Sequence, residues 1–140
     1  MKLICDANEV FSAIIAKGKD LQTKKIDILF SDKVKLFAPT LLFRELEKNS
    51  QKIKEISGFS DIDFDVFVGI LKLRIISISL DDFSDKLEEA KSICSHLKDV
   101  PYFAVALKLD CPIWSGEKKL KKQSKIRVFN TKELVANFGL

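Results

Sequence analysis

The sequence predicts an α/β domain in which a central parallel sheet of four to five strands lies between two layers of helices. Short apolar segments alternate with longer segments whose apolar residues recur at helical spacing. Of the 140 residues, 46% are hydrophobic and 31% are charged, a balance typical of globular proteins. No linker or internal repeat divides the chain, so residues 1–140 are expected to form a single domain.

The first half of the chain opens with a strand, a turn and a helix. Lys2–Cys5 reads as a strand, and Asp6 to Asn8 can cap a helix with an apolar stripe formed by Val10, Phe11, Ile14 and Ile15. A helix containing Leu21 and Ile28 follows, and then a strand over residues 35–38 that Pro39 ends. Thr40 can cap one further helix, closed by Gly58, whose stripe is Leu42, Leu46, Asn49, Ile53 and Ile56.

The second half repeats the alternation. A helix over residues 61–73 precedes the β-branched strand Ile75–Ile78. Asp81 and Asp82 start a helix whose apolar positions are Phe83, Leu87, Ala90, Ile93 and Leu97, and Asp99-Val-Pro opens another through Leu109. Strands are expected over residues 111–114 and 127–129, the first followed by the turn Ser115-Gly116. The last helix begins at Asn130, with Glu133 three residues on.

Several classes of protein are excluded or disfavoured. No apolar run approaches the roughly 20 residues of a membrane span, and no signal peptide opens the chain, so a cytoplasmic protein is expected. Cys5, Cys94 and Cys111 are expected to be buried thiols. Because His96 is the only histidine, a histidine-pair ribonuclease mechanism is excluded. His96 is expected on a surface helix, three residues before Asp99. The five glycines form neither dinucleotide nor nucleoside triphosphate motifs.

Four acidic residues stand where a parallel sheet would bring them together. Asp6 follows the first strand, Glu45 lies in the first turns after the second, Asp99 starts a helix, and Glu117 follows the fourth strand. Gathered carboxylates repel one another unless a cation neutralises them, and their oxygens suit Mg²⁺ or Mn²⁺. Two such ions can activate a water and stabilise the leaving oxygen in phosphodiester hydrolysis. The pattern therefore favours nuclease chemistry.

Each acid also has a structural interpretation. Asp6 and Asp99 could cap helices, and Glu117 could lie in a helix first turn, where the helix dipole favours negative charge. Glu45 fits this interpretation less well, because it borders a buried stripe and needs a partner there. Trp114 is expected in the core, and Tyr102 and Phe103 are ordinary helix-face residues.

The segments LICDANEVFSAI, FAPTLLFRELEK and SHLKDVPYFAVALKLDCPIWSGEKKL together resemble the PIN-domain family, in particular the short VapC-like prokaryotic members. The resemblance spans most of the chain and implies a PIN-like three-layer α/β/α domain. It implies a metal site of Asp6, Glu45, Asp99 and Glu117, supported by Asn8 and Ser115. It further implies ribonuclease activity with Mg²⁺ or Mn²⁺, frequent homodimers and, for toxin members, a small antitoxin partner.

One position departs from the family pattern: Glu117 stands where an aspartate is usual and is one methylene longer. Two alternatives to an active metal-dependent endoribonuclease remain. One, which follows from this departure, is a catalytically weakened PIN-like module that binds RNA or a protein partner. The other is a structural interaction domain whose acids are only caps.

Two further expectations concern partners. The net charge of +4 is modest, but a basic segment near the C-terminus could contact RNA phosphates or be a solvated face, and its RNA-binding candidates are Lys118, Lys119, Lys121 and Lys122. A two-fold homodimer is expected, with residues 61–69 as the candidate interface, because Phe59, Phe64 and Phe67 offer more aromatic surface than one helix needs for core packing.

Overall fold

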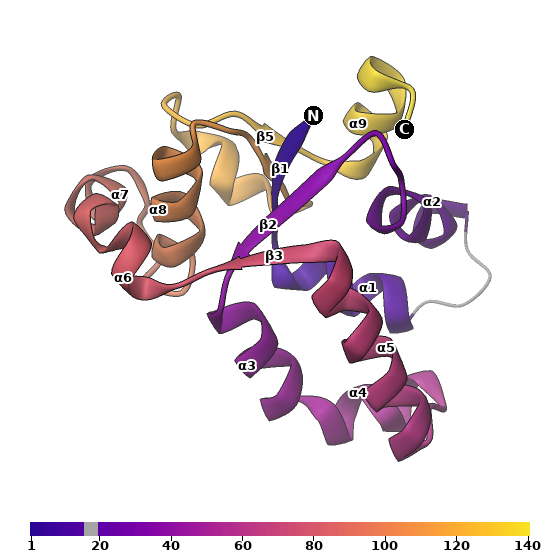
Figure 1. Ribbon diagram of the computed structural model, residues 1–140. Helices are drawn as coiled ribbons and strands as arrows, with labels where there is room; N and C mark the ends of the chain where they lie inside the picture. The colour runs from indigo at the N-terminus through magenta and orange to yellow at the C-terminus, as the bar shows by residue number, and fades with distance from the viewer. Residues whose placement is uncertain (16–19) are drawn as a thin grey trace.

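The computed structural model describes residues 1–15 and 20–140, and the side chains of residues 1–15 and 24–140 (Figure 1). Its sheet contains the parallel strands β1 (Lys2–Cys5), β2 (Lys35–Pro39), β3 (Ile75–Ile78), β4 (Ile113–Trp114) and β5 (Val128–Phe129). Their order across the sheet is β3-β2-β1-β4-β5. The predicted α/β class and its parallel sheet are confirmed.

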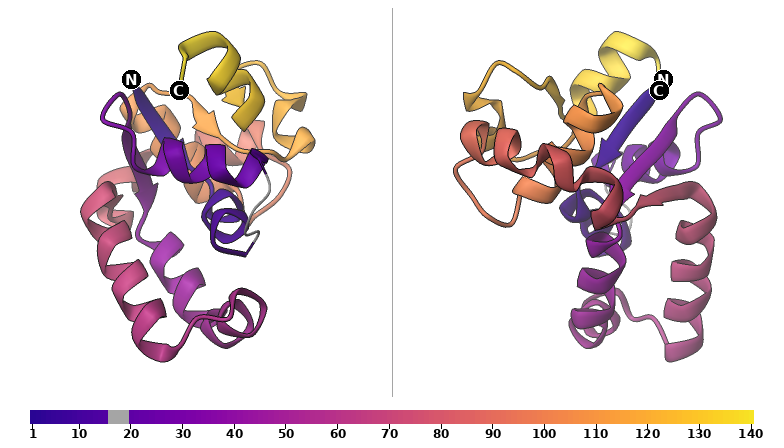
Figure 2. Two further views of the ribbon diagram at one scale, coloured as in Figure 1. Left: turned by 90° about the vertical axis from the view of Figure 1, so that its right-hand side faces the viewer. Right: turned by 60° about the vertical axis from the view of Figure 1, so that its left-hand side comes forward.

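Helices flank the sheet on both sides. On one side lie α6 (Leu80–Phe83), the 3₁₀ turn η1 (Ser84–Lys86), α7 (Leu87–Ile93) and α8 (Val100–Leu109); on the other lie α1 (Ala7–Ile15), α2 (Asp20–Leu29) and α9 (Thr131–Phe138) (Figures 1 and 2). Between β2 and β3 the chain forms α3 (Leu41–Lys48), α4 (Ser50–Ser57) and α5 (Asp61–Arg74), which project beyond one end of the sheet. A second 3₁₀ turn, η2 (Lys118–Lys122), follows β4.

The buried core contains residues of the central strands, of α8 on one side of the sheet and of α1 and α2 on the other. Trp114 is fully buried at the end of β4, and its indole N–H donates a 3.1 Å hydrogen bond to Thr131 Oγ1 at the start of α9. The core role predicted for Trp114 is confirmed. Pro101 occupies the first turn of α8, as predicted, because that turn needs no donor from its backbone nitrogen. Asn130 and Glu133 form the predicted capping box of α9.

The helix predicted from the stripe over residues 42–56 is two helices. Asn49 interrupts it with φ −101° and ψ 12°, and its side-chain amide donates to the carbonyl of Glu45 at 2.8 Å. Asparagine side chains compete in this way with the hydrogen bonds of a helix backbone. The prediction that Thr40 caps this helix is also wrong. Its backbone is already helical (φ −54°, ψ −23°), and its side chain makes no capping hydrogen bond in the described structure.

The single helix predicted from Asp81 to Leu97 is likewise broken. It divides into α6, η1 and α7, and it ends at Ile93 because Cys94 adopts an extended backbone (φ −120°, ψ 123°). Leu97 is therefore exposed instead of buried, and His96 lies in a loop instead of on a helix. Cys5 and Cys111 are buried thiols as predicted, whereas Cys94 is only partly buried.

The aromatic residues predicted to form a surface at residues 59–67 contact the interior instead. Phe64 is buried, and the Phe59 and Phe67 rings are partly buried with their centroids 5.9 Å apart. The exposed apolar side chains of α5 are aliphatic. None of the helices described in residues 1–15 and 20–140 has the length and apolar character that a membrane crossing requires.

Candidate active site

The four predicted acids line one cleft of about 480 Å³. Asp6 directly follows β1, Glu45 lies on α3, Asp99 precedes α8, and Glu117 follows β4. The cleft lies beyond the carboxyl ends of the strands, where the chain order reverses between β1 and β4. Open parallel sheets commonly bind ligands at such a point. The other side chains that line the cleft are those of Asn8, Phe11, Asn49, His96, Lys98, Tyr102 and Lys119.

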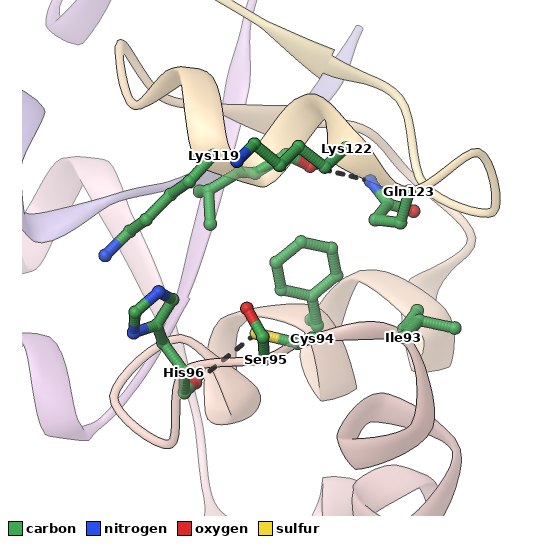
Figure 3. A pocket seen from close by; sticks show the side chains of 9 residues that line it. Ile93, Cys94, Ser95, His96, Lys119, Lys122 and Gln123 are labelled. Carbon is green, nitrogen blue, oxygen red and sulfur yellow. Dashed lines mark hydrogen bonds between the residues drawn. The ribbon is translucent and has the colours of Figure 1, made fainter.

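A smaller hollow of about 180 Å³ adjoins this cleft and shares His96 and Lys119 with it. Figure 3 shows the Lys119 side chain extending past the hollow toward His96. The side chain of Gln123 on its rim is already held by the backbone of Leu120 and Ile126. Phe103, beneath it, is almost fully covered and offers little surface for stacking. The hollow therefore extends the cleft without supplying a second set of reactive groups.

Asp6 is a buried carboxylate held in a fixed orientation. It is 7% exposed, and its oxygens accept hydrogen bonds from Ser115 Oγ at 2.7 Å and from the Asn8 backbone N–H at 3.4 Å. Burial raises the pKa of Asp6 to about 6; the two hydrogen bonds lower it, and the nearby charges of Glu117 and Glu9 raise it further. The ionised form of Asp6 is therefore disfavoured, and a bound cation would stabilise it.

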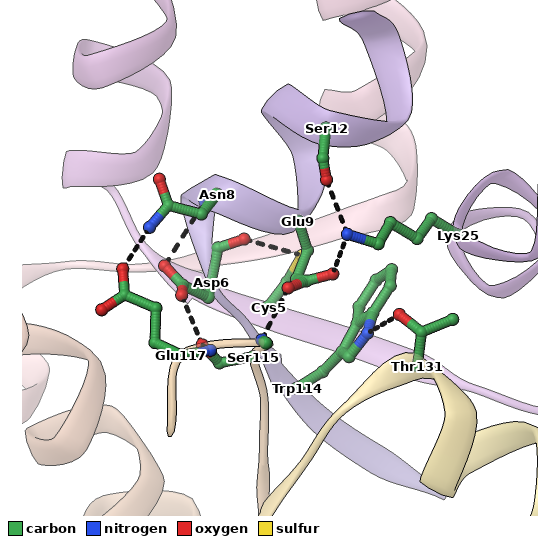
Figure 4. Close-up of polar contacts among 11 residues, drawn as sticks. Cys5, Asp6, Asn8, Glu9, Ser12, Lys25, Trp114, Ser115, Glu117 and Thr131 are labelled. Carbon is green, nitrogen blue, oxygen red and sulfur yellow. Dashed lines mark hydrogen bonds and ion pairs between the residues drawn. The ribbon is translucent and has the colours of Figure 1, made fainter. Parts of the chain in front are cut away.

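Glu117 is tied to the first turn of α1 by two supporting residues that the sequence predicted. Asn8 Nδ2 donates to Glu117 Oε1 at 2.6 Å, and the Glu117 backbone N–H donates to Ser115 Oγ at 3.1 Å (Figure 4). Since Ser115 also donates to Asp6, one hydroxyl links both carboxylate-bearing segments. The Glu117 side chain makes no capping hydrogen bond to η2 in the described part of the chain, so it does not act as a cap.

Glu9 is a buried acid that the sequence analysis missed. It is 2% exposed, and its Oε1 accepts the backbone N–H of Gly116 at 2.7 Å, in the turn between Ser115 and Glu117 (Figure 4). Lys25 of α2 lies 3.0 Å from Glu9 Oε2 and neutralises it. A Cβ on Gly116 would lie only 3.2 Å from Glu9 Oε1, so glycine suits this close contact. In sequence, Glu9 looks like any first-turn acid.

Glu45 has the buried partner that its position demands. The Tyr102 hydroxyl donates to Glu45 Oε1 at 3.3 Å. Burial raises the pKa of Glu45, partly offset by that hydrogen bond, and burial also raises the pKa of Tyr102 well above its usual range. Tyr102 is therefore not the ordinary helix-face residue that the sequence suggested. It spans from α8 to α3 and orients a carboxylate.

Asp99 faces the cleft with an unused oxygen. Among the described residues, its Oδ2 is buried without a hydrogen-bond partner, and Lys119 Nζ lies 3.7 Å from it. Burial raises the pKa of Asp99. The nearby charge of Lys119 lowers this pKa, and the charge of Glu117 raises it. Its side chain makes no capping bond to α8 in the structure as described, so the capping interpretation is not observed for Asp99.

The four lysines predicted to bind RNA point in different directions. Lys119 Nζ lies 3.0 Å from Glu117 Oε2 at the cleft, whereas Lys121 forms an ion pair with Glu133 of α9. Lys122 lines the adjoining hollow, and Lys118 is exposed. Lys98, which the sequence analysis did not single out, also lines the cleft. Two lysines, Lys98 and Lys119, therefore place positive charge in the cleft beside the acids.

The donor set fits a hydrated divalent cation. Burial raises the pKa of three of the four acids, and a cation would favour their charged forms. Within the described residues, no three histidine, cysteine or acidic side chains converge closely enough to hold one ion by direct ligation alone. Mg²⁺ usually takes only one or two carboxylates directly and keeps several waters, so close convergence is not required.

Comparisons with known proteins agree with the fold. A family model of the PIN domain matches residues 4–134. Among solved structures, the chain is similar to one in the crystal structure of VapBC2 from Rickettsia felis bound to a DNA fragment from their promoter, with a TM-score of 0.61 and 15% identity. That match covers 93% of this chain and 98% of that chain. No curated protein sequence matches the chain at a significant level.

Proposed function

The chain belongs to the PIN-domain family, a family of nucleases that typically use divalent metal ions, and on that premise we propose that it is a metal-dependent endoribonuclease. One observation carries the proposal. Four carboxylates from segments up to 111 positions apart, Asp6 to Glu117, line one cleft, and three of them have raised pKa values. Such a cluster is costly unless it binds cations.

Asp6, Glu45 and Asp99 would hold Mg²⁺ or Mn²⁺, and Glu117 would complete the site. A bound ion supplies an activated water and stabilises the leaving oxygen of the phosphodiester. The other side chains orient these ligands. Ser115 and Asn8 fix Asp6 and Glu117, and Tyr102 fixes Glu45.

Positive charge would draw the RNA backbone toward the acids. Lys119 and Lys98 line the cleft itself, and the exposed Lys118 follows Glu117 directly. Lysine contacts with phosphates release counterions and make binding depend on salt. The preference for RNA rests on the likeness to VapC-like members of the family, and Glu117 in place of the usual aspartate keeps the charge that the site needs.

The two alternatives differ from this proposal in specific ways. If the acids were only caps, their side chains would bond to helix N-termini; Asp6 does accept the Asn8 N–H, but Asp99 and Glu117 make no such bond in the described residues. A catalytically weakened module would keep RNA or partner binding without cleavage. The longer Glu117 side chain is the feature that favours this second candidate.

We also propose a small antitoxin-like protein as a partner. The support is the similarity of fold to a chain of the VapBC2 complex, which is itself bound to promoter DNA. A short reading frame directly upstream, whose product co-purifies with this chain, is the expected finding. Failure of the co-expressed upstream product to bind would remove the partner from the proposal without affecting the nuclease.

The experiment that tests the proposed activity is cleavage of a labelled single-stranded RNA by the purified chain in Mg²⁺ or Mn²⁺, with EDTA as the parallel condition. Cleavage is expected with metal only. Asp6→Asn, purified in the same way, controls for contaminating ribonucleases and should be inactive. Cleavage that persists in EDTA or in Asp6→Asn contradicts the assignment. RNA binding without cleavage supports the weakened module.

A further inference from the structure

Lys119 connects the acidic cleft with the hollow that adjoins it. Of the lysines in η2, all within the described part of the chain, only Lys119 lines both spaces. Its side chain is 40% exposed, and Figure 3 shows it extending past the hollow toward His96. Lys121 is held by Glu133 of α9, and Lys122 lines the hollow but not the cleft. Lys119 is therefore a cation at the boundary, on a flexible four-carbon side chain that can extend into either space.

The ammonium group of Lys119 lies between two of the four acids. Its Nζ is 3.0 Å from Glu117 Oε2 and 3.7 Å from Asp99 Oδ2. The second distance is too long for a hydrogen bond, and Asp99 Oδ2 is buried without a hydrogen-bond partner among the described residues. A single positive charge thus links two carboxylates and satisfies the one on Asp99 only in part.

The other two acids do not share this charge. Asp6 and Glu45 form no ion pair with the described side chains and are held by neutral hydrogen-bond donors instead. A divalent cation in the cleft would interact with all four carboxylates, whereas Lys119 contacts two. Two cations cannot occupy the same carboxylate oxygens, because like charges repel strongly at that distance. Metal binding therefore requires Lys119 to leave Asp99 and Glu117.

The adjoining hollow offers Lys119 a second partner. The described side chains that line it include no acid, and both Lys119 and Lys122 border it. The side chain of Gln123 is already held by backbone hydrogen bonds. A positively charged hollow of about 180 Å³ beside a metal cleft fits a phosphate group, which lysine binds through its charge. An RNA strand with one phosphate in the cleft places its next phosphate close to this hollow.

We propose that Lys119 exchanges partners: it balances Asp99 and Glu117 until a metal ion binds, and it then binds an RNA phosphate in the adjoining hollow. This inference rests on the proposed metal site and RNA substrate. Coupling between two binding events is reciprocal. Metal binding should therefore strengthen RNA binding, and RNA should strengthen metal binding by the same factor, because either ligand removes Lys119 from the acids.

Removal of the Lys119 ammonium should tighten Mn²⁺ binding, which is the opposite of what loss of a metal ligand does. Calorimetry without RNA should give a dissociation constant about tenfold lower for Lys119→Met than for the wild type, a typical factor for coupled sites. Lys119→Arg keeps the charge and should bind Mn²⁺ no more tightly than the wild type. Lys98→Met is the matched control, because Lys98 lines the same cleft without an ion pair among the described residues. Its effect should stay below about threefold, since unpaired exposed charges are screened.

The displacement itself can be observed by NMR with Mg²⁺, which is diamagnetic. The Cε–Hε signal of Lys119, assigned from its loss in Lys119→Met, should shift and narrow as Mg²⁺ is added, because the ammonium is released from two carboxylates. The signal of Lys121 should not change, since its partner Glu133 lies on α9 and does not line the cleft.

Binding of a labelled DNA oligonucleotide with phosphorothioate linkages, which resist hydrolysis, tests the second step. Measured by fluorescence anisotropy, the wild type should bind this probe about tenfold more tightly in Mg²⁺ than in EDTA. Lys119→Met should lose most of this gain. Comparing the two proteins under the same conditions cancels the general screening of phosphates by Mg²⁺.

The outcomes separate this inference from the proposed function. A wild type that binds neither Mn²⁺ nor Mg²⁺ removes the metal site and this inference with it. Equal Mn²⁺ affinity of the wild type and Lys119→Met, or an equal gain in Lys98→Met, overturns the exchange and leaves the metal site standing. A probe affinity that responds to Mg²⁺ equally in both proteins overturns the transfer of Lys119 to a phosphate.

Discussion

The buried carboxylate of Asp6 should make the metal-free protein less stable at neutral pH than a variant that lacks its charge. Its pKa rises from a usual value of 3.8 to about 6, mainly because of burial. Each pH unit of difference corresponds to about 1.4 kcal/mol, so the charged form costs the fold about 3 kcal/mol above pH 7. Replacement by asparagine keeps the shape and removes this cost.

The direction of the pH dependence follows from the raised pKa. Well below pH 3.8 the carboxyl is protonated in both the folded and unfolded states, and no cost exists. Between pH 3.8 and about 6 the carboxyl is more ionised in the unfolded state than in the folded state, so the penalty grows with pH and is complete above that range. The free energy of unfolding of Asp6→Asn should therefore exceed that of the wild type by only about 0.5 kcal/mol at pH 4 and by about 2–3 kcal/mol at pH 8, allowing for the added amide hydrogens.

Urea denaturation in EDTA at pH 4, 6 and 8 measures this difference, and thermal melts should show a rise of about 10 °C for the variant at pH 8. Comparing the variant with the wild type at each pH cancels the titration of the other groups. Mn²⁺ should stabilise the wild type and leave Asp6→Asn unchanged. Equal or lower stability of the variant at pH 8, or a difference that does not change with pH, would refute the electrostatic account of the cleft.

Three further predictions concern the residues around Asp6. Glu117→Gln should lower Mn²⁺ affinity or turnover about 10–100-fold, whereas Glu117→Asp should be tolerated. Calorimetry measures the affinity and cleavage rates measure the turnover. A fully active Glu117→Gln would show that Glu117 takes no part in the metal site. Glu9→Ala should weaken Mn²⁺ binding by a similar factor and speed amide exchange at Gly116, whereas Thr131→Val, which removes the buried hydrogen bond from Trp114, should do neither. Replacing the four lysines of η2, Lys118, Lys119, Lys121 and Lys122, by glutamine should weaken RNA binding and make it depend less on salt concentration. An unchanged salt dependence would mean that these lysines form a solvated face and do not bind RNA.

The sequence predicted that the four acids lie together because the ends of strands can be recognised from short apolar segments. Asp6 and Glu117 each follow a short apolar segment, and parallel pairing brings the ends of β1 and β4 together. Glu45 bordered a buried stripe and was correctly expected to need a partner. The gathering of these side chains thus follows from topology, which alternating strands and helices predict.

What the sequence could not supply are contacts between distant segments and the points where helices stop. Tyr102 and Glu45 are 57 positions apart, and nothing in either local pattern indicates their hydrogen bond. The burial of Glu9 depends on Lys25 and Gly116, which belong to two other segments. The breaks at Asn49 and Cys94 arise where backbone conformation overrides an apolar repeat that continues on both sides.

The most direct test of the central claim is the dependence of single-turnover RNA cleavage on Mn²⁺ concentration for the wild type, Glu45→Gln and Asp99→Asn. These two acids lie in different segments and have no hydrogen bond to each other among the described residues. If both are ligands of one catalytic metal site, each variant should need at least about tenfold more Mn²⁺ to reach half of its maximal rate. Metal-dependent cleavage by either variant with the wild-type Mn²⁺ requirement and rate would contradict a shared site in this cleft.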